Sequence, residues 1–233
     1  MIYQFLATTV PSIALVYFFV TLDKFPEPKK IIIITFILGI LITIPAGIFN
    51  TFLDKIIYNN LYYYDYYHEV KTLLVGPVVE EILKFLIILL YCSKLDDFDE
   101  PMDGLVYGAT AALGFAMAEN FHYVYNAENF GTSWQDIALL RAFLTAPMHA
   151  SCGIFIGFSF SYYYFNNKNI IYIFLGLFIA IVFHATFNYG AIYGPLYLSD
   201  FVLIIQLVLV YLTLRNLRKK QKKLSDIIDT LYD

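Results

Sequence analysis

Seven apolar runs, each about twenty residues long or more, constrain this chain more than any other feature. A helix needs about 20 apolar residues to cross a bilayer, and lipid does not satisfy the backbone groups of an open sheet. We therefore expect an all-α, polytopic membrane helix bundle of about seven transmembrane helices, placed in the cell membrane. The expected spans are 2–22, 31–53, 72–92, 104–122, 138–164, 170–189 and 196–214.

The first run is expected to be an uncleaved span, because no Lys or Arg precedes it and no small-residue cleavage site follows it. The loop cations then set the orientation. With the amino terminus outside and the carboxyl terminus cytoplasmic, the inner segments carry 11 basic residues and the outer segments carry 3. The inner set is Lys24, Lys29, Lys30, Lys94, Lys168, Arg215, Arg218, Lys219, Lys220, Lys222 and Lys223; the outer set is Lys55, Lys71 and Arg141.

The chain is expected to form one transmembrane domain over residues 1–214, followed by a basic amphipathic cytoplasmic tail over residues 215–233. The apolar residues of the tail are Leu224, Ile227, Ile228 and Leu231. Such a segment is expected to lie at an anionic leaflet of the lipid bilayer, with an adaptor protein as the weaker alternative. The net charge of −4, without a basic face, excludes nucleic acid as a partner.

Two adjacent glutamates, Glu80 and Glu81, interrupt the apolar stretch 70–90, and Lys84 follows one turn later. An ionisable side chain near the bilayer centre costs a few kcal/mol or more, so these residues indicate a functional site within the membrane. Glu80 and Lys84 have the spacing and order of a favourable pair. Adjacent helical residues point about 100° apart, so one carboxylate would face the cavity while the other orients it or pairs with Lys84.

Four further polar residues lie in apolar runs: Glu119, His149, His184 and Asn188. Each alone has a structural explanation as an interfacial or packing residue, but six such residues together indicate one shared site. His184 and Asn188 are four residues apart, which places them on one helix face. Small residues such as Gly108, Gly153 and Gly157 let the fourth and fifth spans approach closely, so we expect these helices at the centre.

The sequence lacks the residues that several peptidase mechanisms require. His-Glu-x-x-His is absent, because His68-Glu69 is followed by Val-Lys-Thr, and no Gly-x-Ser-x-Gly occurs. There is also no pair of intramembrane aspartates. Cys152 lies three residues after His149 and stays a minor candidate for a thiol nucleophile.

Four elements in order resemble the PrsW family of intramembrane proteases, which is related to the CAAX prenyl endopeptidase superfamily. They lie within residues 76–190: the Glu80-Glu-Ile-Leu-Lys84 element, the stretch from Glu100-Pro-Met-Asp-Gly to Glu119-Asn120, the segment from Arg141 to His149, and His184-Ala-Thr-Phe-Asn188. The CAAX branch has Glu-Glu-x-x-x-Arg and Phe-x-x-x-His. Here Lys84 comes one position earlier and Phe115-x-x-x ends in Glu119, which favours the PrsW branch.

The resemblance implies cleavage of a single-span membrane protein such as an anti-sigma factor. We expect Glu80 or Glu81 to activate a water, with His184 and Asn188 binding the oxyanion or the water. His149 and Glu119 would complete the cavity, and Lys84 would compensate charge.

No cofactor is required by these residues, but a zinc variant stays open, with Glu80, Glu81, His149 and His184 as candidate ligands. The alternatives are a CAAX-type prenyl endopeptidase, a proton-coupled transporter, and a membrane scaffold or immunity protein with an inert polar core.

Overall fold

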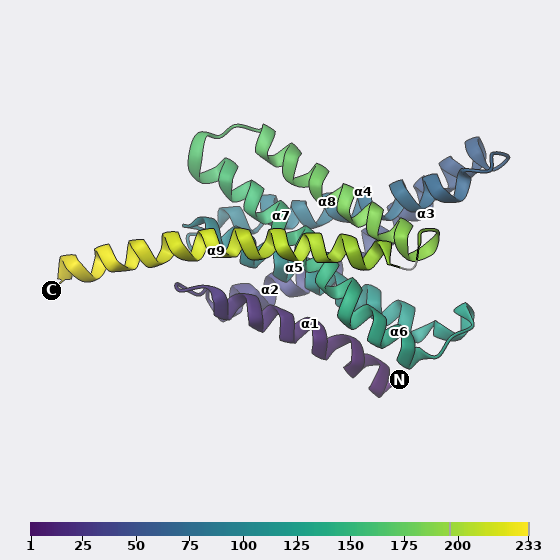
Figure 1. The fold of residues 1–233 in the computed structure, drawn as a ribbon, viewed down its shortest axis with the longest axis horizontal. Helices are drawn as coiled ribbons and strands as arrows, with labels where there is room; N and C mark the ends of the chain where they lie inside the picture. The colour runs from purple at the N-terminus through teal and green to yellow at the C-terminus, as the bar shows by residue number, and fades with distance from the viewer. Residues whose placement is uncertain (196, 233) are drawn as a thin grey trace.

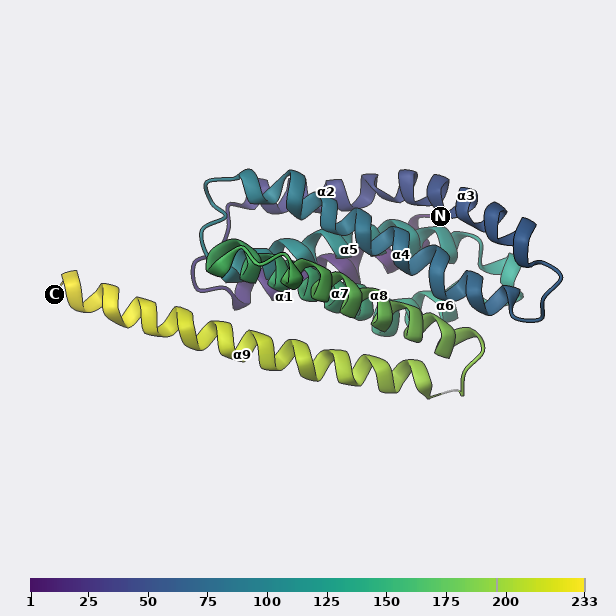
Figure 2. The same ribbon diagram turned by 90° about the horizontal axis from the view of Figure 1, so that it is seen from above.

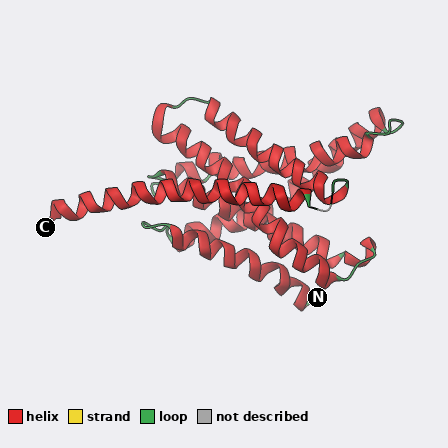
Figure 3. Ribbon diagram, viewed as in Figure 1, coloured by secondary structure: helices red, strands yellow, loops and turns green. Residues whose placement is uncertain are grey.

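The computed structural model describes residues 1–195 and 197–232, and within these residues every regular element is a helix (Figures 1 and 3). The α-helices are α1 (Ile2–Leu22), α2 (Lys29–Leu41), α3 (Thr43–Leu61), α4 (Tyr67–Leu90), α5 (Pro101–Tyr125), α6 (Trp134–Leu140), α7 (Ala146–Tyr162), α8 (Ile171–Ile192) and α9 (Leu198–Tyr232). Helices α2 and α3 meet at Ile42, and α6 continues into α7 through a π-helical turn at Arg141–Thr145.

The nine α-helices of the described residues correspond to the seven predicted spans, because α2 with α3 and α6 with α7 each cover one span. Five helical segments are long and apolar enough to cross a membrane: Ile2–Leu22, Lys29–Leu61, Trp134–Asn166, Ile171–Ile192 and Leu198–Asp226. Helices α4 and α5, which carry the acidic residues of the apolar runs, occupy the two remaining predicted spans. The predicted polytopic helix bundle is therefore confirmed, while the orientation of the termini stays a prediction.

Helix α5 lies at the centre of the bundle and packs most extensively against α7. Glycines make this contact close. A Cβ added at Gly108 would lie 2.1 Å from the carbonyl oxygen of Gly153, and one at Gly153 would lie 2.2 Å from that of Gly108. Gly104 and Gly157 face each other in the same way. Because side chains longer than hydrogen do not fit here, the two backbones touch directly.

Helix α3 is packed far more loosely. Ala46 is its only buried residue, and its main neighbour is α4. In Figure 1, α3 and the start of α4 extend from the bundle at the upper right. The junction at Ile42 allows this divergence, since Pro45 in the first turn of α3 has no N–H to continue the hydrogen bonds of α2.

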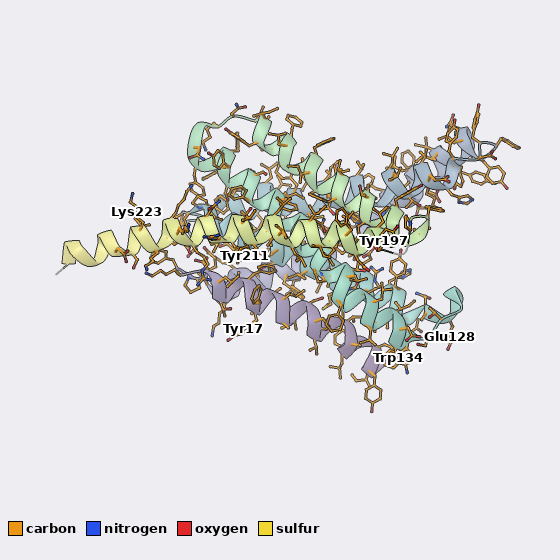
Figure 4. The ribbon with its side chains drawn as sticks, viewed as in Figure 1. Tyr17, Glu128, Trp134, Tyr197, Tyr211 and Lys223 are labelled. Carbon is orange, nitrogen blue, oxygen red and sulfur yellow. The ribbon has the colours of Figure 1, made fainter. Side chains whose placement is uncertain are left out.

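Helix α9 runs along one side of the bundle against α8 and α7, and its end extends beyond the other helices (Figure 2). It is continuous through residue 214, and the division between domain and tail at that residue stays a prediction. Leu224 is exposed, whereas the side chains of Ile227, Ile228 and Leu231 lie outside the described residues. Figure 4 shows Glu128, Trp134 and Tyr197 at one end of the bundle and Lys223 toward the other.

Candidate active site

Two glutamates of α4 are buried at the centre of the bundle. Glu80 is 6% exposed and Glu81 is fully buried, one turn after Pro77 in the same helix. Because the two side chains leave the helix about 100° apart, they have different neighbours. The structure therefore distinguishes two carboxylates that are adjacent in the sequence.

Glu81 holds two other groups of the site in place. Its Oε1 atom lies 2.7 Å from Lys84 Nζ and 2.7 Å from His184 Nδ1. Lys84 is itself buried and contacts His149 Nδ1 at 2.9 Å. The structure thus pairs Lys84 with Glu81 at a spacing of three residues, not with Glu80 at the spacing of four that the sequence suggested.

Glu80 has no comparable partner. Its Oε2 atom is buried without a hydrogen bond among the described residues, and it lies 3.9 Å from His184 Nε2. That separation is longer than a hydrogen bond, which spans about 3 Å between heavy atoms. Glu81 Oε2 also lacks a hydrogen bond, but of these two glutamates Glu80 is the one that lines a cavity.

Glu119 of α5 connects the site to the α6–α7 segment. Its Oε2 atom lies 3.0 Å from His149 Nε2 and 2.5 Å from Arg141 Nη2. Arg141 begins the π-helical turn before α7, donates to Asn120 Oδ1 at 2.6 Å, and stacks over the ring of Tyr123 at 4.0 Å. The guanidinium is fixed on three sides, and through Glu119 it fixes His149.

The charges of the site do not balance among these residues. Three carboxylates, on Glu80, Glu81 and Glu119, face two permanent cations, Lys84 and Arg141. An unpaired buried charge is strongly unfavourable. One negative charge is therefore in excess, which makes the carboxylates ready acceptors for a proton or a bound cation.

A cavity of about 560 Å³ reaches Glu80 and Glu119 from the side of α3. Asn188, one turn after His184 on α8, also lines it. From α3 the lining residues are Thr43, Ala46, Gly47 and Asn50. Their spacing places them on one helix face. The cavity therefore gives access to the two carboxylates without any change in the α5–α7 contact.

The donor atoms fit a zinc ion. One ligand atom each from Glu80, His149 and His184 lies within 4.8 Å of the others, and two histidines with a carboxylate form a common catalytic zinc set. Glu80 Oε2 and His184 Nε2 carry no hydrogen bond within the described chain, while His149 Nε2 would exchange its contact with Glu119. Glu81 lies outside this group.

The structure brings the predicted residues together from four helices, since α4, α5, α7 and α8 supply Glu80, Glu81, Glu119, His149 and His184, with Asn188 on the cavity wall. Cys152 is buried against Ala180 and Gln206 and is not a lining residue of this cavity. From the sequence, Arg141 was counted among the outer cations and placed in the family-like segment from Arg141 to His149, but it was given no role in the site. The signal was a basic residue at the start of an apolar run, 22 positions after Glu119.

Comparisons with known proteins agree with this arrangement. A sequence model described as the PrsW family intramembrane metalloprotease matches residues 27–214. Relatives named Protease PrsW include one from Oceanobacillus iheyensis, 27% identical over 88% of this chain and 92% of its own length. One from Clostridioides difficile is 28% identical over 79% of this chain and 77% of its own, and one from Bacillus subtilis is 31% identical over 65% of each.

No solved structure matches this chain significantly. The family match covers all four helices of the site, and the bundle contains the long apolar helices of a multi-pass membrane protein. The chain therefore belongs to the PrsW family of intramembrane metalloproteases and is a membrane-embedded peptidase.

Proposed function

We propose that this peptidase hydrolyses a membrane-anchored protein in the cavity beside α3, and that Glu80 accepts a proton from the attacking water. One observation carries the assignment to Glu80. Glu80 lines the cavity and Glu81 does not, and the Glu80 carboxylate has no hydrogen bond at Oε2, while Glu81 Oε1 is held by both Lys84 and His184. A general base needs such a free lone pair within reach of the water.

The gap between Glu80 and His184 suits one water molecule. The distance of 3.9 Å between Glu80 Oε2 and His184 Nε2 is too long for a direct hydrogen bond, whereas a water beside both atoms can donate to each. Glu81 accepts the hydrogen of His184 Nδ1, so His184 Nε2 keeps its lone pair. The two acceptors orient the water with its own lone pair toward the cavity.

The other polar residues would bind the substrate carbonyl group and balance the charge of the site. Lys84 donates to His149 Nδ1, which leaves the His149 Nε2 hydrogen on Glu119 and keeps the imidazole neutral. Asn188 lines the cavity one turn from His184, where its amide can donate to the oxyanion of the tetrahedral intermediate. If zinc were bound, Glu80, His149 and His184 would hold it, Glu80 would be a ligand instead of the base, and the ion would supply Lewis-acid polarisation of the carbonyl and acidify water.

The substrate that we propose is a single-span membrane protein, and an anti-sigma factor is the class that the family resemblance suggests. The cavity supports a membrane substrate because its outer wall is α3, which packs loosely and lies in a candidate membrane span. A peptide that enters between α3 and the bundle stays within the hydrophobic layer until it reaches Glu80.

The test is cleavage of single-span substrates by the full chain in proteoliposomes. Glu80→Gln should lower the rate about 100- to 10,000-fold, because the isosteric amide cannot accept the proton. The matched control is Glu128→Gln, which changes an exposed acid outside the cavity and should leave the rate unchanged. Full activity of Glu80→Gln would sink the assignment of the base.

The same preparation distinguishes the alternatives. Proton-coupled flux without any peptide cleavage would identify a transporter and overturn the proposed hydrolysis in this cavity. Zinc content per chain, measured by elemental mass spectrometry, tests the ligand group. His149→Ala and His184→Ala should each lose the metal, whereas Cys92→Ser should retain it, since Cys92 is buried outside the group.

A further inference from the structure

A second cavity, of about 870 Å³, lies between the end of α1 and α9, far along the chain from the residues of the peptidase site. Four basic residues of α9 line it: Arg215, Arg218, Lys219 and Lys222. Their spacing of three, four and seven residues from the first is that of one helix face. The basic stretch of α9 is therefore not uniform, because one of its faces encloses a cavity with α1.

The cations around this cavity are unpaired. None of the four has an ion pair or a hydrogen bond from its side chain within the described part of the chain. With Lys24, five basic residues line the cavity, against two acidic residues, Asp23 and Asp226. The Asp23 carboxylate already accepts hydrogen bonds from Gln221 and from the amide of Phe25. The lining thus carries a net charge of +3.

The wall on the other side of the cations is apolar. Phe18 and Leu22 of α1 and Tyr211 and Leu214 of α9 line it, and the ring of Phe18 is half exposed. These residues end the apolar parts of two candidate membrane spans. The cavity therefore lies at the boundary between the hydrocarbon layer and water, where lipid phosphates are found.

We propose that this cavity binds the headgroup of an anionic phospholipid. Arginine and lysine side chains recognise phosphate oxygens, and a basic pocket between membrane helices at the interface is a general site for acidic headgroups. The apolar wall favours a lipid over free phosphate, because an acyl chain covers Phe18 and Tyr211 while the phosphate contacts the arginines. This binding is independent of the peptidase reaction.

The test measures lipid binding to the delipidated full chain in detergent by native mass spectrometry. Phosphatidylglycerol should bind more tightly than phosphatidylcholine, and inorganic phosphate at the same concentration should not displace it. The double variant Arg218→Gln/Lys222→Gln should weaken phosphatidylglycerol binding about 25-fold, since each cation near an anionic headgroup contributes roughly fivefold.

The matched control is Lys220→Gln/Lys223→Gln, which removes the same charge from the same helix. Neither residue lines the cavity, and Figure 4 shows Lys223 on the side of α9 away from α1. This control should weaken binding much less than the cavity variant, because salt screens exposed charges that do not contact the headgroup. Equal weakening by both double variants, equal binding of phosphatidylcholine, or displacement by inorganic phosphate would each overturn the proposal. All four residues are exposed, so folding is preserved.

Discussion

The two walls of the peptidase site are packed in opposite ways. On the α5–α7 side, a Cβ at Gly153 would lie 2.2 Å from a backbone oxygen, so nothing can be inserted. On the α3 side, a Cβ at Gly47 would meet nothing within 4 Å, although Gly47 lines the same cavity. One glycine brings two backbones together, and the other keeps a space open.

The difference in packing between the α5–α7 wall and the α3 wall matches the role that we propose for each wall. Glu119 on α5 and His149 on α7 meet across the tight contact at 3.0 Å, and a shift of about 1 Å can lower a rate about 100-fold. A peptide substrate, by contrast, needs room to enter beside Glu80. In the proposed reaction, the rigid wall would hold the reacting groups in place, and the loose wall would admit the substrate chain.

The largest effect should come from the same substitution on the two walls. Gly153→Ala forces α5 and α7 apart and should destabilise the protein by about 3 kcal/mol or more, as overpacking of a tight core does. Gly47→Ala should leave the thermal midpoint in detergent unchanged or raise it slightly, because Ala is the better helix former and its Cβ meets no neighbour. Equal midpoints for the two variants would contradict the packing difference.

An intermediate effect should come from filling the loose wall. Gly47→Phe projects a ring into the cavity and should reduce cleavage of a single-span substrate about 10- to 100-fold without altering the thermal midpoint. Ile48→Phe is the control, since Ile48 is 65% exposed on the outer face of α3. If both variants cleave at the wild-type rate while Glu80→Gln is inactive, substrate does not enter beside α3.

The smallest effect concerns pH and the amino-terminal end of α5. Glu100 caps this helix outside the membrane span, and burial raises its pKa from 4.5 to about 7. Burial also raises the pKa of Asp23, which shares the amide of Gln221 with Glu100. Between about pH 4.5 and pH 7 the folded chain holds a proton that the unfolded chain has lost, so stability falls as pH rises.

The measurement is the thermal midpoint in detergent from about pH 5 to about pH 8, where the decline should be shallower in Glu100→Gln than in wild type. Glu128→Gln serves as the control, because Glu128 is exposed and lies at the other end of the bundle. A wild-type midpoint that rises with pH would show that Glu100 is ionised in the fold. The stability of α5, which packs tightly against α7, would then not depend on a protonated Glu100 at its N-cap.

The sequence predicted the seven spans because lipid imposes the length and the helical form of each one. It did not predict the junction at Ile42, since apolar residues continue through it and only the first turn of α3 reveals the change. It also selected the glutamates and histidines correctly as neighbours, because each is unfavourable alone in a membrane.

The partners within the site were harder to predict. Lys84 can reach a carboxylate three or four residues earlier, and the position of His149 on α7 decides in favour of Glu81. No site role was predicted for Arg141 because its partner is on another helix, so no local spacing connects it to Glu119. Contacts between helices depend on how the helices pack, which cannot be predicted from the spacing of residues along the sequence.

The buried ion pairs also have consequences for biosynthesis. Glu81 finds Lys84 on its own helix, so α4 carries its counter-charge as it leaves the ribosome. Glu119 depends on Arg141 and His149, which are translated later and lie beyond the turn that follows α5. Until α6 and α7 are synthesised, the Glu119 carboxyl lacks both partners, so we expect it to stay protonated or at the interface. The order of translation makes the docking of α7 the event that first shields the Glu119 charge from lipid.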